Sequence, residues 1–161
     1  MLQDATSENF SLEAKTLIVF GCAVLYACAF KFNVYVFEHV AFSKFVNWVF
    51  IPSGLQLLFV LVFLELGAFG VAAGSIFIHY TNTPHEHLFN IVTSLISGGS
   101  PLLAQVIAKR LFGLDITLTG FNAQLLFKVS VLFAVVSPIL HQIWYFCVGR
   151  IENLVTDTVV M

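Results

Sequence analysis

The chain has 161 residues, of which 59% are hydrophobic and 10% are charged, and its net charge is −2. An ordinary soluble domain carries about 25% charged residues, and a domain of this size cannot hide so much apolar surface from water. The composition therefore predicts a protein embedded in the lipid bilayer. The charges are scattered and form no basic patch, which argues against a nucleic-acid partner.

The N-terminal part of the chain predicts a tail and a first helix. Residues 1–13 are polar and acidic, unlike the basic start of a cleavable signal peptide, so we expect a tail followed by an uncleaved anchor. The apolar run Leu17–Phe30 is the first predicted span. Residues 33–50 mix aromatic and charged side chains, which indicates a loop with an amphipathic piece at the membrane surface. Residues 14–161 as a whole are expected to form one helical membrane domain.

The longest apolar run, Gly54–Tyr80, contains a single charged residue, Glu65. The run is either one tilted helix or two short helices that turn near Glu65-Leu66-Gly67. In one tilted helix, a carboxylate inside the hydrocarbon would be costly, and Glu65 would invite a role as a proton-relay acid or ligand contact. In a hairpin, Glu65 would face water at the turn. Candidate partners for it are Gln56, Gln105 and His141.

Small residues follow Glu65 on one helical face. Gly67, Gly70 and Gly74 have the spacing that lets another helix approach closely. We expect these glycines to pack against a helix of the same chain rather than to form a dimer.

The second half of the chain predicts two more spans, Leu88–Ala108 and Val129–Val148. Ser97-Gly98-Gly99-Ser100-Pro101 is expected to interrupt the first of them, and Pro138 lies near the middle of the second. None of these runs alternates between apolar and polar residues, which favours helices. The fold class predicted is all-α: a polytopic integral membrane helical bundle of about four to five transmembrane helices, some short or broken. Residues 158–161 become apolar again, as in a chain truncated before another helix.

The basic residues suggest an orientation. Lys31 and Lys44 form one cluster, and Lys109-Arg110 forms another. The positive-inside rule would place both clusters in the cytoplasm, which requires an even number of crossings between them. One tilted helix over residues 54–80 and the span over residues 88–108 together satisfy this requirement and put the acidic N-terminus outside. A hairpin at Glu65 does not satisfy it.

The histidines were considered as metal ligands. His79, His85 and His87 lie close in sequence, and imidazole suits zinc and other transition metals. Their spacing matches no metal-binding motif, so we predict a wet loop between helices and no bound cofactor. Haem held between His79 and His141 is the less favoured reading.

Two further polar residues lie together in the last span. His141 and Gln142 follow Pro138 by about one turn, where the proline frees a backbone carbonyl. They either repair the helix locally or line a small cavity. With Glu65 and Gln105, they complete the candidate ligand-binding or proton-linked residues. No hydrolytic triad, phosphate loop or dinucleotide motif is present, so we predict no enzymatic activity.

Pro52-Ser53-Gly54-Leu55, the apolar run that follows, its glycine-rich second half and the Gly-Ser-Pro helix together resemble the MASE-type membrane-associated sensor domains over residues 48–161. This resemblance implies a small multi-pass module of the bacterial inner membrane with a sensory or interaction role. Members of that family usually precede a kinase or a cyclic-dinucleotide enzyme, and these 161 residues contain no such output domain. The signal would then pass to a separate signalling protein or through a homo-oligomer.

Two other functions remain open on the sequence alone. Broken helices with polar groups at mid-depth are also used by transporters and by substrate-binding membrane subunits. A metal- or haem-binding membrane protein is the third hypothesis, and it depends on the histidines named above.

Overall fold

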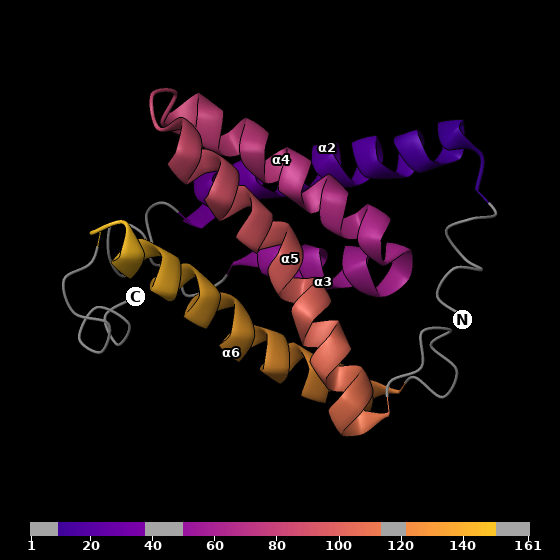
Figure 1. Cartoon of the computed structure of the whole chain (residues 1–161). Coiled ribbons are helices and arrows are strands. Elements are labelled where there is room, and N and C mark those ends of the chain that lie inside the picture. The colour runs from indigo at the N-terminus through magenta and orange to yellow at the C-terminus, as the bar shows by residue number, and fades with distance from the viewer. Residues whose placement is uncertain (1–9, 38–49, 114–121, 151–161) are drawn as a thin grey trace.

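The computed structural model describes residues 10–37, 50–113 and 122–150, and these residues form five α-helices and no strands (Figure 1). The all-α fold class is therefore confirmed. The predicted surface segment within residues 38–49 and the apolar end at 158–161 lie outside the described residues. The helices are α2 (Leu12–Phe37), α3 (Ile51–Phe63), α4 (Glu65–Asn82), α5 (His87–Phe112) and α6 (Ala123–Cys147).

Three of these helices, α2, α5 and α6, are long and apolar enough to cross a membrane. Each has 25 or 26 residues, which at about 1.5 Å per residue gives close to 38 Å, more than the roughly 30 Å of a hydrocarbon core. Local signals set their ends. Asn122 caps α6 by accepting the Leu125 N–H at 2.9 Å, and Gly113 ends α5 in the left-handed conformation.

The expected break at residues 97–101 is wrong, because α5 runs through these residues as one helix. Pro101 has no backbone N–H to donate within the helix. Ser97 and Gly98 nevertheless make specific contacts in the helical conformation. The Ser97 hydroxyl donates to the Thr93 carbonyl at 3.0 Å. A Cβ atom on Gly98 would lie 2.4 Å from the Ala68 carbonyl oxygen, so this glycine permits close packing of α5 on α4. Pro138 is likewise accommodated inside α6.

The apolar run at residues 54–80 folds as a hairpin of two helices. Leu64 separates α3 from α4 with φ 53° and ψ −125°. The two helices then pack so closely that a Cβ atom on Gly67 would lie 2.1 Å from the Phe59 carbonyl oxygen. The structure therefore adopts the hairpin alternative, and Glu65 is an exposed residue in the first turn of α4.

We expect Leu64→Gly to stabilise the protein. A non-glycine residue in such a sparsely populated backbone region costs about 1–3 kcal/mol, and glycine adopts it without that penalty. Part of the gain is offset by losing a half-buried leucine side chain. The free energy of unfolding in detergent micelles should rise by up to about 1 kcal/mol. Leu66→Gly, inside the α4 helix, is the matched control and should lower it by a similar amount.

The helices alternate in direction along the bundle. Gly70 of α4 lies against Cys22 of α2, and Gly74 lies against Ala23 and Tyr26 further along α2, so these two helices run parallel. In the structure these glycines thus pack within the chain. Figure 1 shows α5 between α4 and α6, running opposite to both.

Two apolar clusters hold the helices together. One joins α3, α5 and α6, and the other joins α2, α3 and α4, so the short helix α3 contributes to both. The first contains Leu57, Leu61, Ala104, Ala108, Val129 and Phe133. The second contains Cys22, Tyr26, Phe59, Val71 and Ile78.

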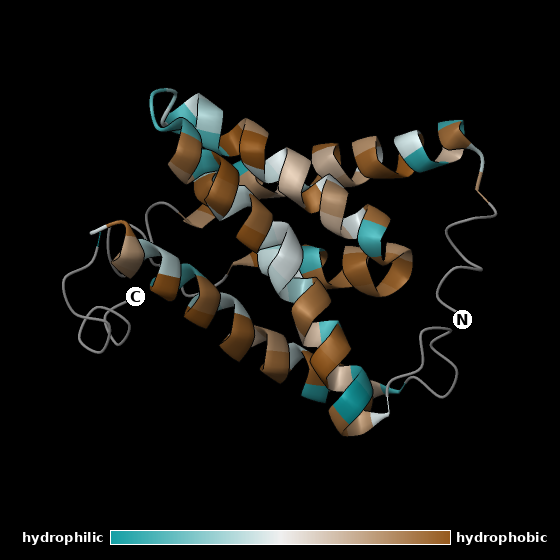
Figure 2. Cartoon of the chain, in the orientation of Figure 1, coloured by the Kyte–Doolittle hydropathy of each residue, from teal (hydrophilic) through white to brown (hydrophobic). Residues whose placement is uncertain are grey.

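The hairpin overturns the orientation argument from the basic residues. Three helices, α3, α4 and α5, separate Lys31 from Lys109-Arg110, and each runs opposite to the one before it. Lys31 and the Lys109-Arg110 pair therefore lie at opposite ends of the bundle. Figure 2 shows hydrophilic residues at the α4–α5 connection and at the far end of α5.

Candidate functional site

Helix α5 buries polar side chains inside an otherwise apolar bundle. Half of its most apolar stretch is buried, against 17% for α2 and 11% for α6. Small polar residues let membrane helices approach closely and hydrogen-bond to one another. The buried polar residues of α5 are Asn90, Thr93, Ser94, Ser97, Ser100 and Gln105.

Hydrogen bonds between side chains connect α5 to α6. Ser100 donates to the Ser137 hydroxyl at 3.3 Å. The Ser97 hydroxyl lies 3.3 Å from the Nε2 atom of His141. Trp144 Nε1 donates to the Thr93 hydroxyl at 3.0 Å. We call this set the α5–α6 seam; its members are Thr93, Ser97, Ser100, Ser137, His141 and Trp144.

His141 is the one titratable member of the seam. Its Nδ1 atom lies 2.9 Å from the carbonyl oxygen of Ser137, one turn earlier on α6. Its ring is half-buried and meets the ring of Tyr145 edge-on at 6.1 Å. His79 on α4 interacts with it electrostatically. The seam thus places a proton-accepting group between helices rather than at a water-exposed end.

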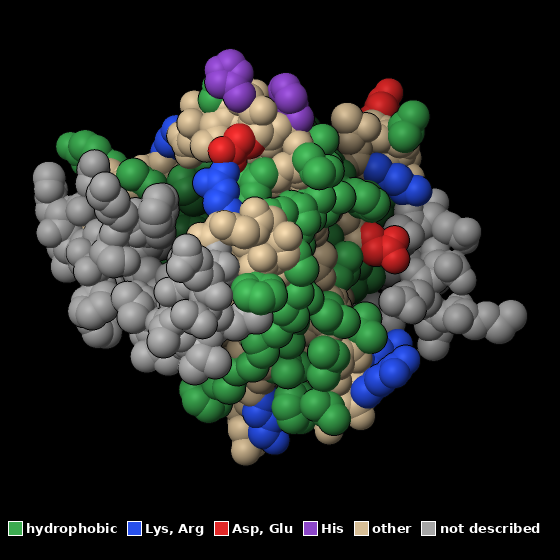
Figure 3. Space-filling view, turned by 60° about the vertical axis from the view of Figure 1, so that its left-hand side comes forward, with side chains coloured by type: hydrophobic (Ala, Val, Ile, Leu, Met, Phe, Trp, Pro, Cys, Tyr) green, Lys and Arg blue, Asp and Glu red, His purple; other side chains and the backbone are tan. Residues whose placement is uncertain are grey.

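An aromatic group covers one end of the seam. The Phe89 ring stacks on Trp144 and Tyr145, with centroids 6.4 and 5.6 Å apart. The Arg150 guanidinium lies 4.6 Å from the Phe89 ring centroid and forms an ion pair with Glu86. This arrangement ties the end of α6 to the start of α5. Figure 3 shows one side of the molecule, with hydrophobic side chains over its middle and histidines and charged side chains toward its edges.

The candidates proposed from sequence do not all meet in one place. Glu65 is exposed at the hairpin turn. Gln56 donates to the Tyr26 hydroxyl at 2.8 Å instead of pairing with Glu65. Gln105 and Gln142 are both buried, at 8% and 6% exposure. His141 lies against a polar group of α5, the Ser97 hydroxyl.

The histidine cluster at the α4–α5 connection has other partners. His87 Nδ1 lies 3.1 Å from the Tyr80 hydroxyl, and the His79 ring packs edge-on against Phe89. His85 is exposed. Across the three described stretches of chain, no group of three or more His, Cys, Asp or Glu side chains is arranged to hold a metal ion.

The serine and threonine residues of the α5–α6 seam are not identified by the sequence analysis. Thr93, Ser97 and Ser100 recur at intervals of four and three residues, which places them on one face of a helix. That spacing indicates a polar stripe on a helix. The glycine, serine and proline content of the same residues instead predicts a break in the helix, which conflicts with the stripe.

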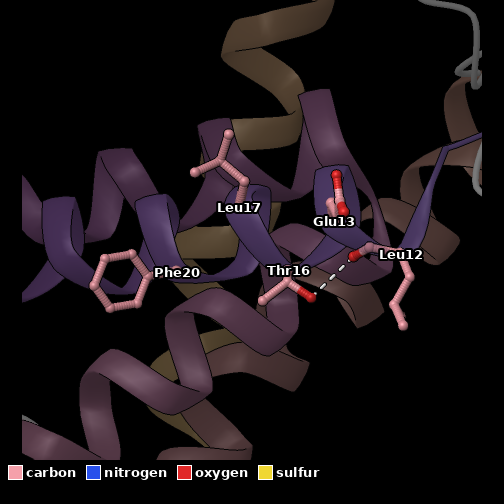
Figure 4. A pocket seen from close by; sticks show the side chains of 5 residues that line it. All are labelled: Leu12, Glu13, Thr16, Leu17 and Phe20. Atoms are coloured by element: carbon pink, nitrogen blue, oxygen red, sulfur yellow. Dashed lines mark hydrogen bonds between the residues drawn. The ribbon is translucent and has the colours of Figure 1, made fainter.

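A shallow depression lies on the outside of α2 (Figure 4). All of its lining residues belong to this one helix: Leu12, Glu13, Thr16, Leu17 and Phe20. Thr16 donates back to the Leu12 carbonyl at 2.9 Å, so its hydroxyl is already used within the helix. The depression therefore offers little that could bind a substrate.

Comparisons with protein-family models, with curated proteins and with solved structures found no match to this chain.

Proposed function

We propose that this chain is a multi-pass protein of the bacterial inner membrane and acts as a non-enzymatic sensory or interaction module, similar to the MASE-type domains. The observation that supports this most is the α5–α6 seam. A titratable side chain inside a membrane bundle is costly and suggests a functional role. Here it bonds two helices to each other, as a sensory element between helices would require.

The exposed surfaces support a membrane location. The outer face of α6 exposes a row of large apolar side chains, and water would disfavour such a surface. Lipid covers it without that penalty. The exposed large apolar residues of α6 are Leu126, Phe127, Val131, Val135, Ile139, Ile143 and Phe146.

A sensory role needs two packing states of similar free energy. The contacts of α4 involve glycines that hold helices at backbone distance, and the seam adds hydrogen bonds whose pattern depends on proton positions. A stimulus that changes the seam would move α6 relative to α5. Because α6 exposes its opposite face, a partner helix docked there would follow the movement.

The proposal is tested by photo-crosslinking in the native membrane. A photoreactive amino acid at Val135, which is 53% exposed, should capture a protein that carries a histidine-kinase or cyclic-dinucleotide output domain. The same substitution at Val129, which is fully buried on the same helix, is the matched control and should capture none. Capture of lipid and chaperones alone, or of transport ATPase subunits, would contradict the sensory role.

A further inference from the structure

The hydrogen-bond partners of His141 determine where its protons lie. Nδ1 faces the Ser137 carbonyl oxygen at 2.9 Å, and Nε2 faces the Ser97 hydroxyl at 3.3 Å. A backbone carbonyl can only accept a hydrogen bond. Nδ1 therefore carries a proton in both charge states of the ring, and the second proton is gained or lost at Nε2.

Ser97 has one hydroxyl proton and two neighbours that can accept it. Its oxygen lies 3.0 Å from the Thr93 carbonyl oxygen as well as 3.3 Å from Nε2 of His141. When Nε2 has no proton, the carbonyl and the imidazole compete for the same hydroxyl proton. When Nε2 is protonated, it donates to Ser97, and Ser97 donates to Thr93. Each donor in this series of hydrogen bonds then has its own acceptor.

We propose that His141 is a proton switch for the packing of α5 against α6. Protonation at Nε2 completes a chain of hydrogen bonds from the Ser137 carbonyl across the seam to the Thr93 carbonyl. Deprotonation makes Nε2 an acceptor, and it has no donor while the Ser97 hydroxyl donates to the Thr93 carbonyl. A buried acceptor without a donor costs about 1–3 kcal/mol, so the contact between Ser97 and Nε2 changes and the two helices repack. The purpose of the switch rests on the proposed sensory function: it makes proton concentration the signal.

The groups around His141 leave its charge state open to change. Burial opposes the charged ring, whereas the two hydrogen bonds to oxygen atoms favour it. Helix α3 carries no titratable side chain, and α4 contributes His79, which interacts with His141 electrostatically. The ion pair found in the described part of the chain joins two other residues, Glu86 and Arg150. The remaining titratable groups on these helices are Glu65 and Tyr80 on α4, His87, Lys109 and Arg110 on α5, and Lys128, Tyr145 and Cys147 on α6.

Nitrogen NMR tests the proton positions directly. The full chain, labelled with ¹⁵N-histidine and held in lipid nanodiscs, would be titrated between about pH 5 and 8, the range in which histidines ordinarily change charge. His141→Gln assigns the signal. We expect a neutral ring protonated on Nδ1 that gains a second proton on Nε2 as the pH falls. A neutral ring protonated on Nε2, or no titration in this range, would overturn the proposal.

Distances between spin labels test the helix movement. Leu95 and Ile143 are exposed on α5 and α6, at 57% and 49%, and can be replaced by cysteine in a chain whose native cysteines are removed. We expect the label distance to shift by about 1–2 Å with pH, the scale of helix shifts in known switches. His141→Gln should abolish the shift, and His79→Gln should retain it.

A second variant tests the switch independently, in case His141→Gln does not fold. Ser97→Ala keeps the imidazole but removes the hydroxyl that connects the helices, so His141 should still titrate while the label distance no longer follows it. A distance that is independent of pH in the parent, or still dependent on pH in Ser97→Ala, would contradict the switch. No partner is needed in these measurements. They can therefore fail while photo-crosslinking succeeds, or succeed while it fails.

Discussion

Gly98→Ala should destabilise the bundle, whereas Gly99→Ala, one residue along the same helix, should not. A Cβ atom on Gly98 would lie 2.4 Å from the Ala68 carbonyl oxygen and 3.0 Å from the Ala72 Cβ atom of α4. A backbone carbonyl cannot move aside alone, so α4 and α5 must separate. On Gly99 a Cβ atom would meet nothing within 4 Å.

The magnitudes of the two changes can be compared. Overpacking in a well-packed contact costs about 1–3 kcal/mol, while replacing a helical glycine by alanine gains about 0.5–1 kcal/mol. Gly98→Ala should therefore lower the free energy of unfolding by up to about 2 kcal/mol, and Gly99→Ala should raise it slightly. Reversible unfolding of the purified protein in micelles measures both. Equal stabilities for the two variants would contradict the α4–α5 contact.

The same pair of glycines shows why sequence reasoning erred over residues 97–101. Glycine and proline are poor helix formers, so their concentration there was interpreted as a break in the span. Tertiary contact overrides that local preference, because Gly98 is needed for the approach to Ala68. Whether residues 97–101 are helical depends on how α4 packs against α5, and a local sequence pattern does not predict that packing.

The turn that does exist was located to within a few residues but for a different reason. Glu65 and Gly67 marked the region by their charge and size, while the residue that reverses the chain is Leu64. Leucine has no preference for a positive φ. The close contact of Gly67 with the Phe59 carbonyl explains why a hairpin forms at this point, and this contact depends on how α3 and α4 pack.

The candidate site was predicted in part. The sequence indicates His141 because it follows Pro138 by about one turn in an apolar span, and that reasoning needs only the sequence. Its partner Ser97 lies 44 residues away, so the pairing depends on the relative register of α5 and α6. The sequence indicates Glu65 as well, because a carboxylate inside a long span would be costly. The hairpin removes that argument by exposing the residue.

The largest expected effect is an all-or-none difference in cysteine labelling between the two ends of the bundle. We expect α4 to cross the membrane, which would place Glu65 and His85 on opposite sides, since α4 runs from Glu65 to the region of His85. The Glu65 end also carries Lys15, Lys109, Arg110 and Lys128, whereas the described basic residues at the other end are Lys31 and Arg150. The positive-inside rule therefore favours the Glu65 end in the cytoplasm.

Single cysteines at these two positions test this arrangement. The chain without its native cysteines would be expressed in a bacterium whose outer membrane is then permeabilised. A membrane-impermeant maleimide added to these cells should label His85→Cys. It should label Glu65→Cys only after the inner membrane is broken. Both sites are exposed in the structure, so a difference in labelling reports the side of the membrane and not burial. Labelling of both from the same side would contradict α4 as a crossing helix. Labelling of Glu65→Cys but not of His85→Cys with the inner membrane intact would still support α4 as a crossing helix. It would show that the excess of basic residues at the Glu65 end, four against two, does not set the orientation. That outcome would matter for the switch as well. Phe89, Trp144 and Arg150 place the seam nearer the His85 end, so the orientation decides which compartment's protons reach His141.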